Sequence, residues 1–263
     1  MSATGNSIIE AVNARPMGFS NLTGLDCSIR DDDRVMLLGP DNDMLSRYMK
    51  ILAGVEPSAS GTVLIDGQDT SSMDNAGRRR LRSRIGYVPQ AVPLLSVISG
   101  RQNMMLAARY HALADEAVLV KRANALLNDL PEASQHDNLP AYMSERLRRL
   151  LALARPLMLE PQVLFIENPL HGLDHADRAI IEAYLLSLQR DRRMALVISS
   201  DDLGLALRFG GRLLFCDGDR SMMFASARDM ERVDLVSLRS MQAQQNMPQG
   251  RNESTSDTGT SHD

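Results

Sequence analysis

Short apolar runs alternate with segments of helical pattern along most of this chain. The runs VMLL (35–38), VLFI (163–166) and ALVI (195–198) are continuously apolar, as expected for strands that helices cover on both faces. GTVLIDGQD (61–69) is broken by glycines and polar residues and predicts an antiparallel edge element. The alternation predicts an α/β fold, with strands near residues 7–12, 25–30, 34–39, 61–68, 84–90, 161–168, 192–200 and 211–218.

Residues from about 98 to 155 are rich in Leu, Ala, Met and Arg and contain few β-branched residues. This composition predicts a helical subdomain inserted into the α/β core. We expect one folded domain over residues 1–240. Residues 241–263 form a polar tail without a large apolar residue after Met247, and such a segment cannot offset the entropy of ordering, so we expect it to be disordered.

Composition excludes several classes of protein. A net charge of −4 and a pI near 5.8 give no electrostatic reason to expect a nucleic-acid partner. Cys27 and Cys216 fit no metal or redox spacing and predict buried free thiols in a reducing compartment. No apolar run approaches the ~18 residues that a membrane span needs, and no charged-then-apolar leader opens the chain. We therefore expect a cytoplasmic protein, or one held at the inner face of a membrane through partners.

Five segments occur in an order and at a spacing that resemble one family. They are LLGP (37–40), ILAGVEPSASGTVLIDGQD (51–69), RIGYVPQ (84–90), LALARPLMLEPQVLFIENPLHGLD (151–174) and VISSDDLGLALRFGGRLLFCDG (197–218). Together they resemble the ATPase subunit of ATP-binding cassette (ABC) transporters from about Ile8 to Val236. The resemblance implies a P-loop NTPase-like (RecA-like) core with an antiparallel β-subdomain and an inserted α-helical subdomain.

The phosphate loop of this family, G-x-x-x-x-G-K-[S/T], is altered. Its glycines let backbone N–H groups cradle phosphate, its lysine neutralises the β and γ groups, and its hydroxyl holds Mg²⁺. Here the first glycine and the hydroxyl remain, as Gly39 and Ser46, whereas Leu45 takes the lysine position. Met44 takes the second glycine position, and carboxylates enter at Asp41 and Asp43. Two acids and no lysine predict a loop that repels a triphosphate.

The catalytic positions are altered as well. The family's Walker B strand ends in Asp-Glu-Pro, where this chain has Glu167-Asn168-Pro169. Glu167, with Ser46, is a weak candidate ligand for Mg²⁺, but Asn168 stands at the position of the catalytic glutamate and has no basic lone pair at neutral pH. Asp201 stands at the position of the switch histidine and would repel a γ-phosphate. Arg47 and Lys50 lie too far along the helix to replace the missing lysine.

The signature segment L-S-G-G-Q, which caps the opposite subunit's ATP in the family, aligns with residues 143–147. Ser144 remains, but Glu145 and Arg146 replace its glycines. The adenine-stacking aromatic residue expected at 14–19 is not evident, although Phe19 is close. The interface motifs are better kept. They are the Q-loop residue Gln90, which in the family lies beside the docking groove for the membrane subunit, and the D-loop residues at the dimer interface, Gly172, Leu173 and Asp174.

Each of these residues also fits a purely structural role in its own segment. Gly39 and Ser46 fit a plain strand–turn–helix, in which glycine supplies backbone freedom and Ser46 is an ordinary helical position. Glu167 and Asn168 fit a strand end with local hydrogen bonds, and Asp201 and Asp202 an N-cap pair for a helix over 203–209. Gln90 fits a structural role as well as a docking role. The arginine runs at 78–84 and 146–149 fit solvated faces, or a contact with anionic lipid or an acidic partner.

Three functions remain open from the sequence. The first is a degenerate, catalytically inactive cassette subunit that docks on a transmembrane permease and pairs with another cassette subunit, as a homodimer or heterodimer, in lipid or solute transport. In outline it is similar to the ATPases of bacterial lipid-trafficking (Mce/Mla-type) importers. No cofactor is expected, unless an intact partner subunit supplies the groups that ATP and Mg²⁺ need. The second function is a nucleotide-free structural or regulatory adaptor. The third is a weak ATPase using Glu167 and Arg47.

Overall fold

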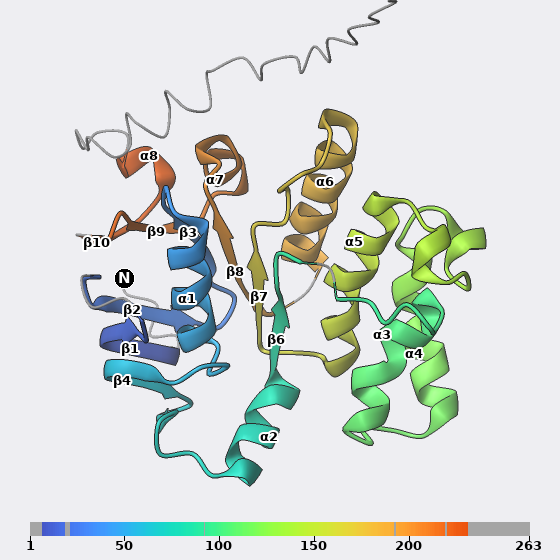
Figure 1. Ribbon diagram of the computed structural model, residues 1–263, viewed down its shortest axis with the longest axis horizontal. Helices are drawn as coiled ribbons and strands as arrows, with labels where there is room; N and C mark the ends of the chain where they lie inside the picture. The colour runs from blue at the N-terminus through green and yellow to red at the C-terminus, as the bar shows by residue number, and fades with distance from the viewer. Residues whose placement is uncertain (1–6, 19–21, 92, 192, 219, 231–263) are drawn as a thin grey trace, which may run out of the picture.

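The computed structural model describes residues 7–18, 22–91, 93–191, 193–218 and 220–230, and it forms two sheets flanked by helices (Figure 1). The strands are β1 Ser7–Pro16, β2 Leu25–Arg30, β3 Arg34–Leu38, β4 Ser58–Ile65, β5 Gln68–Asp69, β6 Ile85–Val88, β7 Val163–Glu167, β8 Ala195–Ser200, β9 Arg212–Cys216 and β10 Ser221–Phe224. The α-helices are α1 Asn42–Leu52, α2 Asn75–Arg84, α3 Gly100–Tyr110, α4 Glu116–Asn128, α5 Glu145–Ala154, α6 His175–Asp191, α7 Leu203–Phe209 and α8 Ala227–Met230. Three 3₁₀ helices are η1 Ala133–Gln135, η2 Pro140–Tyr142 and η3 Arg155–Leu159.

The larger sheet has the strand order β10-β9-β3-β8-β7-β6. All neighbouring pairs are parallel except β9 and β10, which are antiparallel. The three continuously apolar runs are β3, β7 and β8, all in the interior of this sheet. Alternate side chains of these strands belong to two separate hydrophobic clusters. Helices α5, α6 and α7 contribute to one cluster, and α1 with the smaller sheet contributes to the other. The mixed α/β fold is therefore confirmed.

The smaller sheet is antiparallel, in the order β2-β1-β4-β5. Segment 61–69, predicted to be an edge element, is divided between two strands. β4 pairs with β1 on one side and β5 on the other, so only β5, at Gln68–Asp69, lies at the edge. The prediction of an antiparallel arrangement is confirmed, but the edge position is wrong for β4 because the chain turns back at Asp66 and Gly67, both with positive φ, and β5 pairs with the other side of β4.

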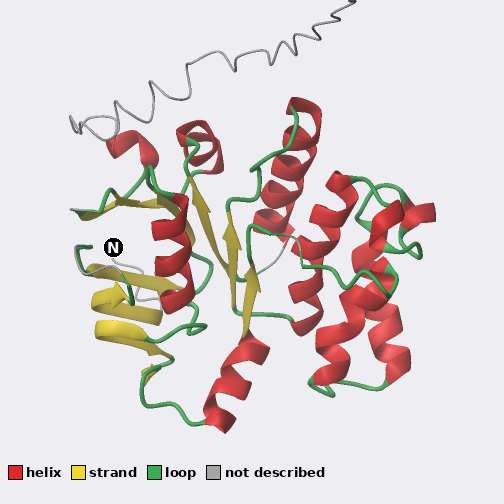
Figure 2. Cartoon of the chain, viewed as in Figure 1, coloured by secondary structure: helices red, strands yellow, loops and turns green. Residues whose placement is uncertain are grey.

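The stretch from α3 to α5 contains helices and 3₁₀ turns and lies to one side of the sheet (Figure 2). A further helix, α2, is not predicted from the hydrophobic pattern. Its sequence NAGRRRLRSR buries only Gly77 and Leu81. The helix begins where the Asp74 carboxylate accepts the amide of Gly77 at 2.6 Å. The arginine run before the Q-loop strand is therefore helical.

The remaining predictions are met in part. Cys27 and Cys216 are both free; Cys216 is buried as predicted, whereas Cys27 is partly exposed. In the described part of the chain, no helix is long and apolar enough to cross a membrane. Phe19 and the tail at 241–263 lie outside the described residues.

Candidate functional site

The altered motifs gather at one edge of the larger sheet. Strands β3, β6, β7 and β8 are parallel, with Leu38 opposite Ser200 and Glu167 opposite Ser199. Their carboxyl ends therefore meet at one edge, the usual place for a ligand in an open α/β sheet. The residues that follow these strands are Gly39, Gln90, Asn168 and Asp201. The structure thus brings together most of the candidate site residues predicted from the sequence.

At the position of the phosphate loop, the backbone amides of Asp43, Met44 and Leu45 are already bonded. Helix α1 begins at Asn42, and its N-cap is Asp41. The Asp41 carboxylate accepts the amides of Asp43 at 2.9 Å and Met44 at 3.1 Å. The amide of Leu45 donates to the Asp41 carbonyl oxygen at 3.0 Å. An N-terminus of this kind is an anion site, and here the chain's own carboxylate occupies it.

Leu45 points into the core rather than toward the loop. Its exposed fraction is 1%, and it belongs to the hydrophobic cluster that joins α1 to the antiparallel sheet. A Cβ atom added to Gly39 would lie 2.2 Å from the Cys216 carbonyl oxygen and 3.1 Å from a Leu45 methyl group. Gly39 is therefore needed for close approach to β9. The predicted reason, unusual backbone freedom, is wrong because Gly39 is not among the residues with positive φ.

The Glu167 carboxylate is bonded within the chain. Its Oε1 accepts the hydroxyl of Ser46 at 2.8 Å and the hydroxyl of Tyr87, and its Oε2 accepts the backbone amide of Gln90 at 3.1 Å. Glu167 is 6% exposed. We call these four residues the Glu167 cluster. The prediction of local hydrogen bonds is wrong for Glu167, and Ser46 is not an ordinary helical position, because α1, β6 and β7 converge here.

Tyr87 was not predicted from the sequence. It lies on β6 and is partly buried. Its partner on β7 is Phe165, and Phe165 precedes Glu167 by two positions. Burial, and then the hydrogen bond to Glu167, raise the pKa of Tyr87, so its hydroxyl remains a donor. The available signal was a tyrosine within an apolar strand, because a tyrosine buried there usually finds a hydrogen-bond acceptor.

The cations nearest in sequence to the missing lysine are engaged elsewhere. Arg47 and Lys50 both pair with Glu56, at 3.0 Å and 3.6 Å. Glu167 and Ser46 are bonded to each other rather than held apart around an ion-sized space. Among the described residues, no group of three or more His, Cys, Asp or Glu side chains is placed to hold a metal. As arranged, the Ser46 hydroxyl and the Glu167 carboxylate face each other and are not free to face a magnesium-bound triphosphate.

Asn168 and Asp201 complete this edge. Asn168 has a φ of 36°, its amide donates to the Ser199 carbonyl at 2.9 Å, and it is 4% exposed. Its side-chain nitrogen is buried without a partner in the described part of the chain. The Asp201 carboxylate accepts from the Asn42 side chain at 3.1 Å. The N-cap of α7 is Asp202 and not Asp201, so the predicted N-cap pair is wrong for Asp201.

Asp202 is the N-cap of α7. It accepts the amide of Leu205 at 3.0 Å and pairs with Arg178 at 2.6 Å. The predicted helix over 203–209 and the capping role of Asp202 are therefore confirmed. Asp202 caps the helix because its carboxylate reaches the amide of Leu205 in the first turn.

The signature segment forms an internal ion-pair network. Ser144 is the N-cap of α5, accepting the amide of Leu147 at 3.1 Å and donating to Glu132 at 3.2 Å. Arg146 lies between Glu132, at 2.5 Å, and Asp177, at 2.7 Å. This network links the helical region to the first turn of α6. Glu132, 12 residues before Ser144 in sequence, was not predicted, since nothing in the local pattern marks it.

The D-loop forms the turn into α6. Gly172 has a φ of 73°, Leu173 is buried at 9% exposed, and the Asp174 carboxylate accepts the amide of Asp177 at 2.8 Å. Gly172 and Asp174 are exposed. The predicted role of the D-loop in a dimer stays a prediction.

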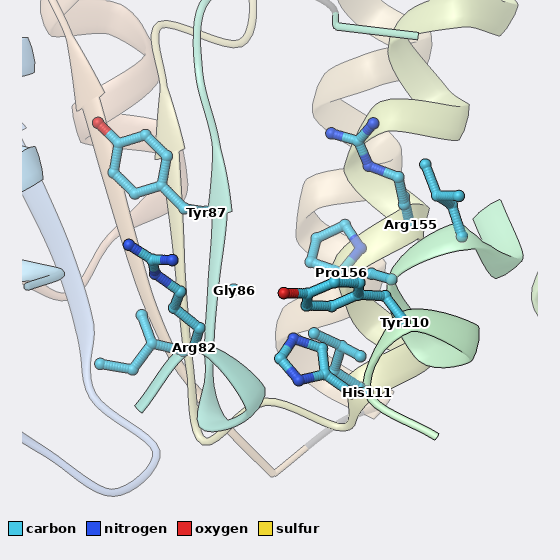
Figure 3. Close-up of a pocket in the computed structure, with 11 residues that line it drawn as sticks. Arg82, Gly86, Tyr87, Tyr110, His111, Arg155 and Pro156 are labelled. Atoms are coloured by element: carbon cyan, nitrogen blue, oxygen red, sulfur yellow. The ribbon is translucent and has the colours of Figure 1, made fainter. Parts of the chain in front are cut away.

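A groove opens between the sheet and the helical region (Figure 3). Its volume is about 490 Å³. We call it the α2–α3 groove. Its main lining residues are Arg82, Tyr87, Leu106, Tyr110, Arg155 and Pro156. In Figure 3, Arg82 and Tyr87 lie on one side, Tyr110, Arg155 and Pro156 lie on the other, and the Tyr110 hydroxyl points into the gap. Tyr87 therefore belongs to both the groove and the Glu167 cluster.

Comparison with known sequences finds relatives over most of the chain. The family model described as "ABC transporter" matches residues 22–171. The uncharacterized ABC transporter ATP-binding protein YbbA of Escherichia coli K12 is 33% identical over 192 residues, covering 72% of this chain and 83% of YbbA. The lipoprotein-releasing system ATP-binding protein LolD of Syntrophus aciditrophicus is 29% identical, covering 75% of this chain and 89% of LolD.

Solved structures show the same fold at lower sequence identity. The chain superposes on the ATP-binding cassette MJ0796, solved as a dimer bound to ADP and Pi, with a TM-score of 0.72 and 22% identity over 82% of this chain and 98% of that one. It superposes on CbiO1 of Clostridium perfringens, part of the transporter complex CbiONQ, with a TM-score of 0.74 and 20% identity over 91% of this chain and 99% of that one.

Proposed function

This chain belongs to the ABC transporter family, and we propose that it is a cassette subunit that does not turn over ATP on its own. In this role it docks on a transmembrane permease at the inner face of a membrane and pairs with another cassette subunit. Its relatives bear names of different transport systems, such as the lipoprotein-releasing LolD and the sulfate/thiosulfate importer CysA of Chlorella vulgaris. The cargo class, lipid or solute, is therefore left open.

One observation carries the proposal. Both groups that would receive Mg-ATP are bonded to the chain itself, the α1 N-terminus to the Asp41 carboxylate and the Glu167 carboxylate to Ser46, Tyr87 and Gln90. A nucleotide would have to displace these bonds. It would then face carboxylates without a counter-charge, at about 3 kcal/mol per charge pair for ~5 Å and an effective dielectric constant near 20.

The Glu167 cluster also supports a docking role. Tyr87 lines the α2–α3 groove and donates to Glu167. The amide of the Q-loop residue Gln90 donates to the same carboxylate. The wall of the groove is thus held by a protein carboxylate rather than by a bound ligand. We infer that the groove keeps one shape, so that permease docking does not depend on nucleotide.

The altered signature supports pairing with an intact subunit rather than a self-sufficient homodimer. Two copies of this chain would contain neither a phosphate-loop lysine nor a catalytic glutamate. Ser144 would be the signature residue that this chain contributes to a partner's site, and its hydroxyl already donates to Glu132. Any hydrolysis in such a complex would use the partner's lysine and base.

An ATPase assay of the purified chain tests the proposal, with a mock preparation from cells lacking the gene as the control. We expect turnover equal to that of the mock preparation. Turnover well above it, abolished by Glu167→Ala, would contradict the proposal and support the weak ATPase. That alternative needs Arg47, which pairs with Glu56.

A second candidate is a nucleotide-free adaptor that stabilises a membrane complex and pairs with no cassette. The bonds from the phosphate-loop amides to Asp41 favour this function as much as the first. Copurification from the native membrane distinguishes the two. An intact cassette ATPase in the complex supports the first, and a permease without any other cassette supports the adaptor.

A further inference from the structure

The two arginine runs of the chain differ in how far carboxylates of the chain neutralise them. In the run on α5, each arginine pairs with at least one carboxylate, as Arg146 does with Glu132 and Asp177. The run on α2 has no acidic residue within its helix. In the described part of the chain it forms one ion pair, from Arg84 to Asp66. Most of the positive charge of α2 is therefore not neutralised by these residues.

Helix α2 directs this charge away from the core. Its buried residues, Gly77 and Leu81, are four positions apart and share one face. Arg79 and Arg82 are three positions apart and lie together on the other side of the helix, with Arg80 beside them. All three arginines are exposed, and none forms an ion pair or side-chain hydrogen bond with another described residue. We call them the α2 basic face. Because like charges this close repel each other, negative charge from outside the chain would stabilise this face.

The α2 basic face lies at the opposite end of the sheet from the altered motifs. Helix α2 ends at Arg84 and β6 begins at Ile85, so α2 lies at the amino end of β6. Gly39 and Asp201 instead follow the carboxyl ends of β3 and β8. In Figure 1, α2 and the turn between α3 and α4 project at the same end of the molecule. A ligand of the α2 basic face is therefore independent of the phosphate-loop position.

Exposed apolar side chains lie beside the α2 basic face. Arg82 lines the α2–α3 groove together with Leu106 and Tyr110 of α3, and Figure 3 shows Arg82 and Tyr110 on two sides of the same gap. Leu106 is 42% exposed, Tyr110 is 76% exposed, and Leu113, in the turn after α3, is 41% exposed. Arginines next to an exposed tyrosine and exposed leucines are typical of a surface that meets a membrane, where arginine contacts phosphate and the apolar side chains enter the headgroup boundary.

We infer that the α2 basic face binds a membrane surface that carries anionic phospholipid. This rests on the proposed function, which places the chain at the inner face of a membrane, where negative headgroups attract basic segments. The exposed leucines favour a bilayer over a nucleic acid, because a bilayer takes up apolar side chains and a phosphate backbone does not. An acidic peptide is the less suitable partner, because the three arginines spread around the helix rather than converge on one point.

The test is cosedimentation of the full chain with phosphatidylcholine vesicles that contain either no phosphatidylglycerol or one third of it. The chain should bind the anionic vesicles roughly tenfold or more tightly than the neutral ones, with the advantage shrinking as salt rises. Arg79→Gln with Arg82→Gln should weaken binding to the anionic vesicles by about 25-fold, at about fivefold for each charge. Arg79→Lys with Arg82→Lys should retain the binding, because the charge is kept. Tyr110→Ser should weaken the binding at low and high salt alike, because its contribution is apolar.

The matched control is Arg148→Gln with Arg208→Gln. It removes the same charge from arginines that pair with Glu145 and Glu182, and it should leave the binding within about twofold. Equal binding to both kinds of vesicle, no binding to either, or full binding by the glutamine variant overturns the inference. So does binding of single-stranded RNA or polyglutamate that depends on Arg79 and Arg82, with none to vesicles. The ATPase assay contains no lipid, so a failure here is distinct from a failure of the proposed function.

Discussion

The Ser46 hydroxyl donates to the Glu167 carboxylate at 2.8 Å, joining two residues that are 121 positions apart in sequence. In the family these two positions hold a magnesium ion between them. Here they hold each other, and Tyr87 and Gln90 donate to the same carboxylate. In this chain they stabilise the end of the sheet instead.

Glu167→Gln should therefore destabilise the protein. The amide that replaces one carboxylate oxygen is a donor, and it would face the donors of Gln90 or of Ser46 and Tyr87. We expect a loss of about 1–3 kcal/mol in the free energy of unfolding, the cost of leaving a buried group unsatisfied. Urea denaturation measures it.

The control is Glu56→Gln, because Glu56 is partly exposed and forms ion pairs with Arg47 and Lys50. It should change stability by less than about 1 kcal/mol. If Glu167→Gln leaves stability unchanged or raises it, the Glu167 carboxylate does not stabilise the chain without a bound cation. The interpretation of the Glu167 cluster is then wrong.

Tyr87 and Glu167 should be energetically coupled. Tyr87→Phe removes one donor and should cost about 1 kcal/mol, but much less in a Glu167→Gln background, because the acceptor is then already altered. A double-mutant cycle measured by urea unfolding gives the coupling. Tyr142→Phe is the control, since Tyr142 is 74% exposed. Strictly additive effects would mean that the hydroxyl and the carboxylate do not interact.

Leu45→Lys should not restore nucleotide binding, even together with Asn168→Glu. Leu45 is 1% exposed, so a lysine there is either buried or displaces α1, and Asp41 still occupies the helix N-terminus. We expect a large fall in the urea midpoint, against a loss of less than about 1.5 kcal/mol for the volume-conserving Leu45→Met. A stable double variant that binds Mg-ATP would show that the loop has only lost its ligands.

The two thiols predict an alkaline limit to stability. Cys27 is partly exposed as a residue, but its thiol is enclosed by neighbouring atoms, and this burial raises the pKa of Cys27 to about 12, above its ordinary value of 9.0. Burial also raises the pKa of Cys216. The unfolded state then ionises first, so the stabilising contribution is complete below about pH 8.5 and is lost as the pH rises toward 12. Urea midpoints between pH 7 and 10 should fall less in a Cys27→Ser, Cys216→Ala variant. An equal fall would contradict the pKa shifts.

Part of the fold was predictable because a strand that is buried on both faces has an uninterrupted apolar sequence. The runs at 35–38, 163–166 and 195–198 are apolar at every position, and they are the central strands β3, β7 and β8. The inward position of Leu45 was also within reach, since Met44, Leu45, Tyr48, Met49 and Leu52 follow one helical face and all are buried. The Asp202 cap is similarly local, because three residues separate it from its amide partner.

The rest of the site depends on contacts between distant segments. Tyr87 and Glu167 are 80 positions apart, and only the pairing of β6 with β7 brings them together. Glu132 meets Arg146 across a turn in which Glu132 itself adopts a φ of 59°. No periodic pattern encodes such a pair. The basic helix α2 was missed for a related reason, since it buries too little apolar surface to show a stripe.

Calorimetric titration of the purified chain with Mg-ATP tests the central claim most directly, because it measures binding without requiring turnover. With Asp41 on the amides of α1 and Glu167 bonded to three donors, we predict no saturable heat up to millimolar nucleotide. A one-site isotherm with micromolar affinity, weakened by Ser46→Ala, would show that the site opens to nucleotide and would contradict the account.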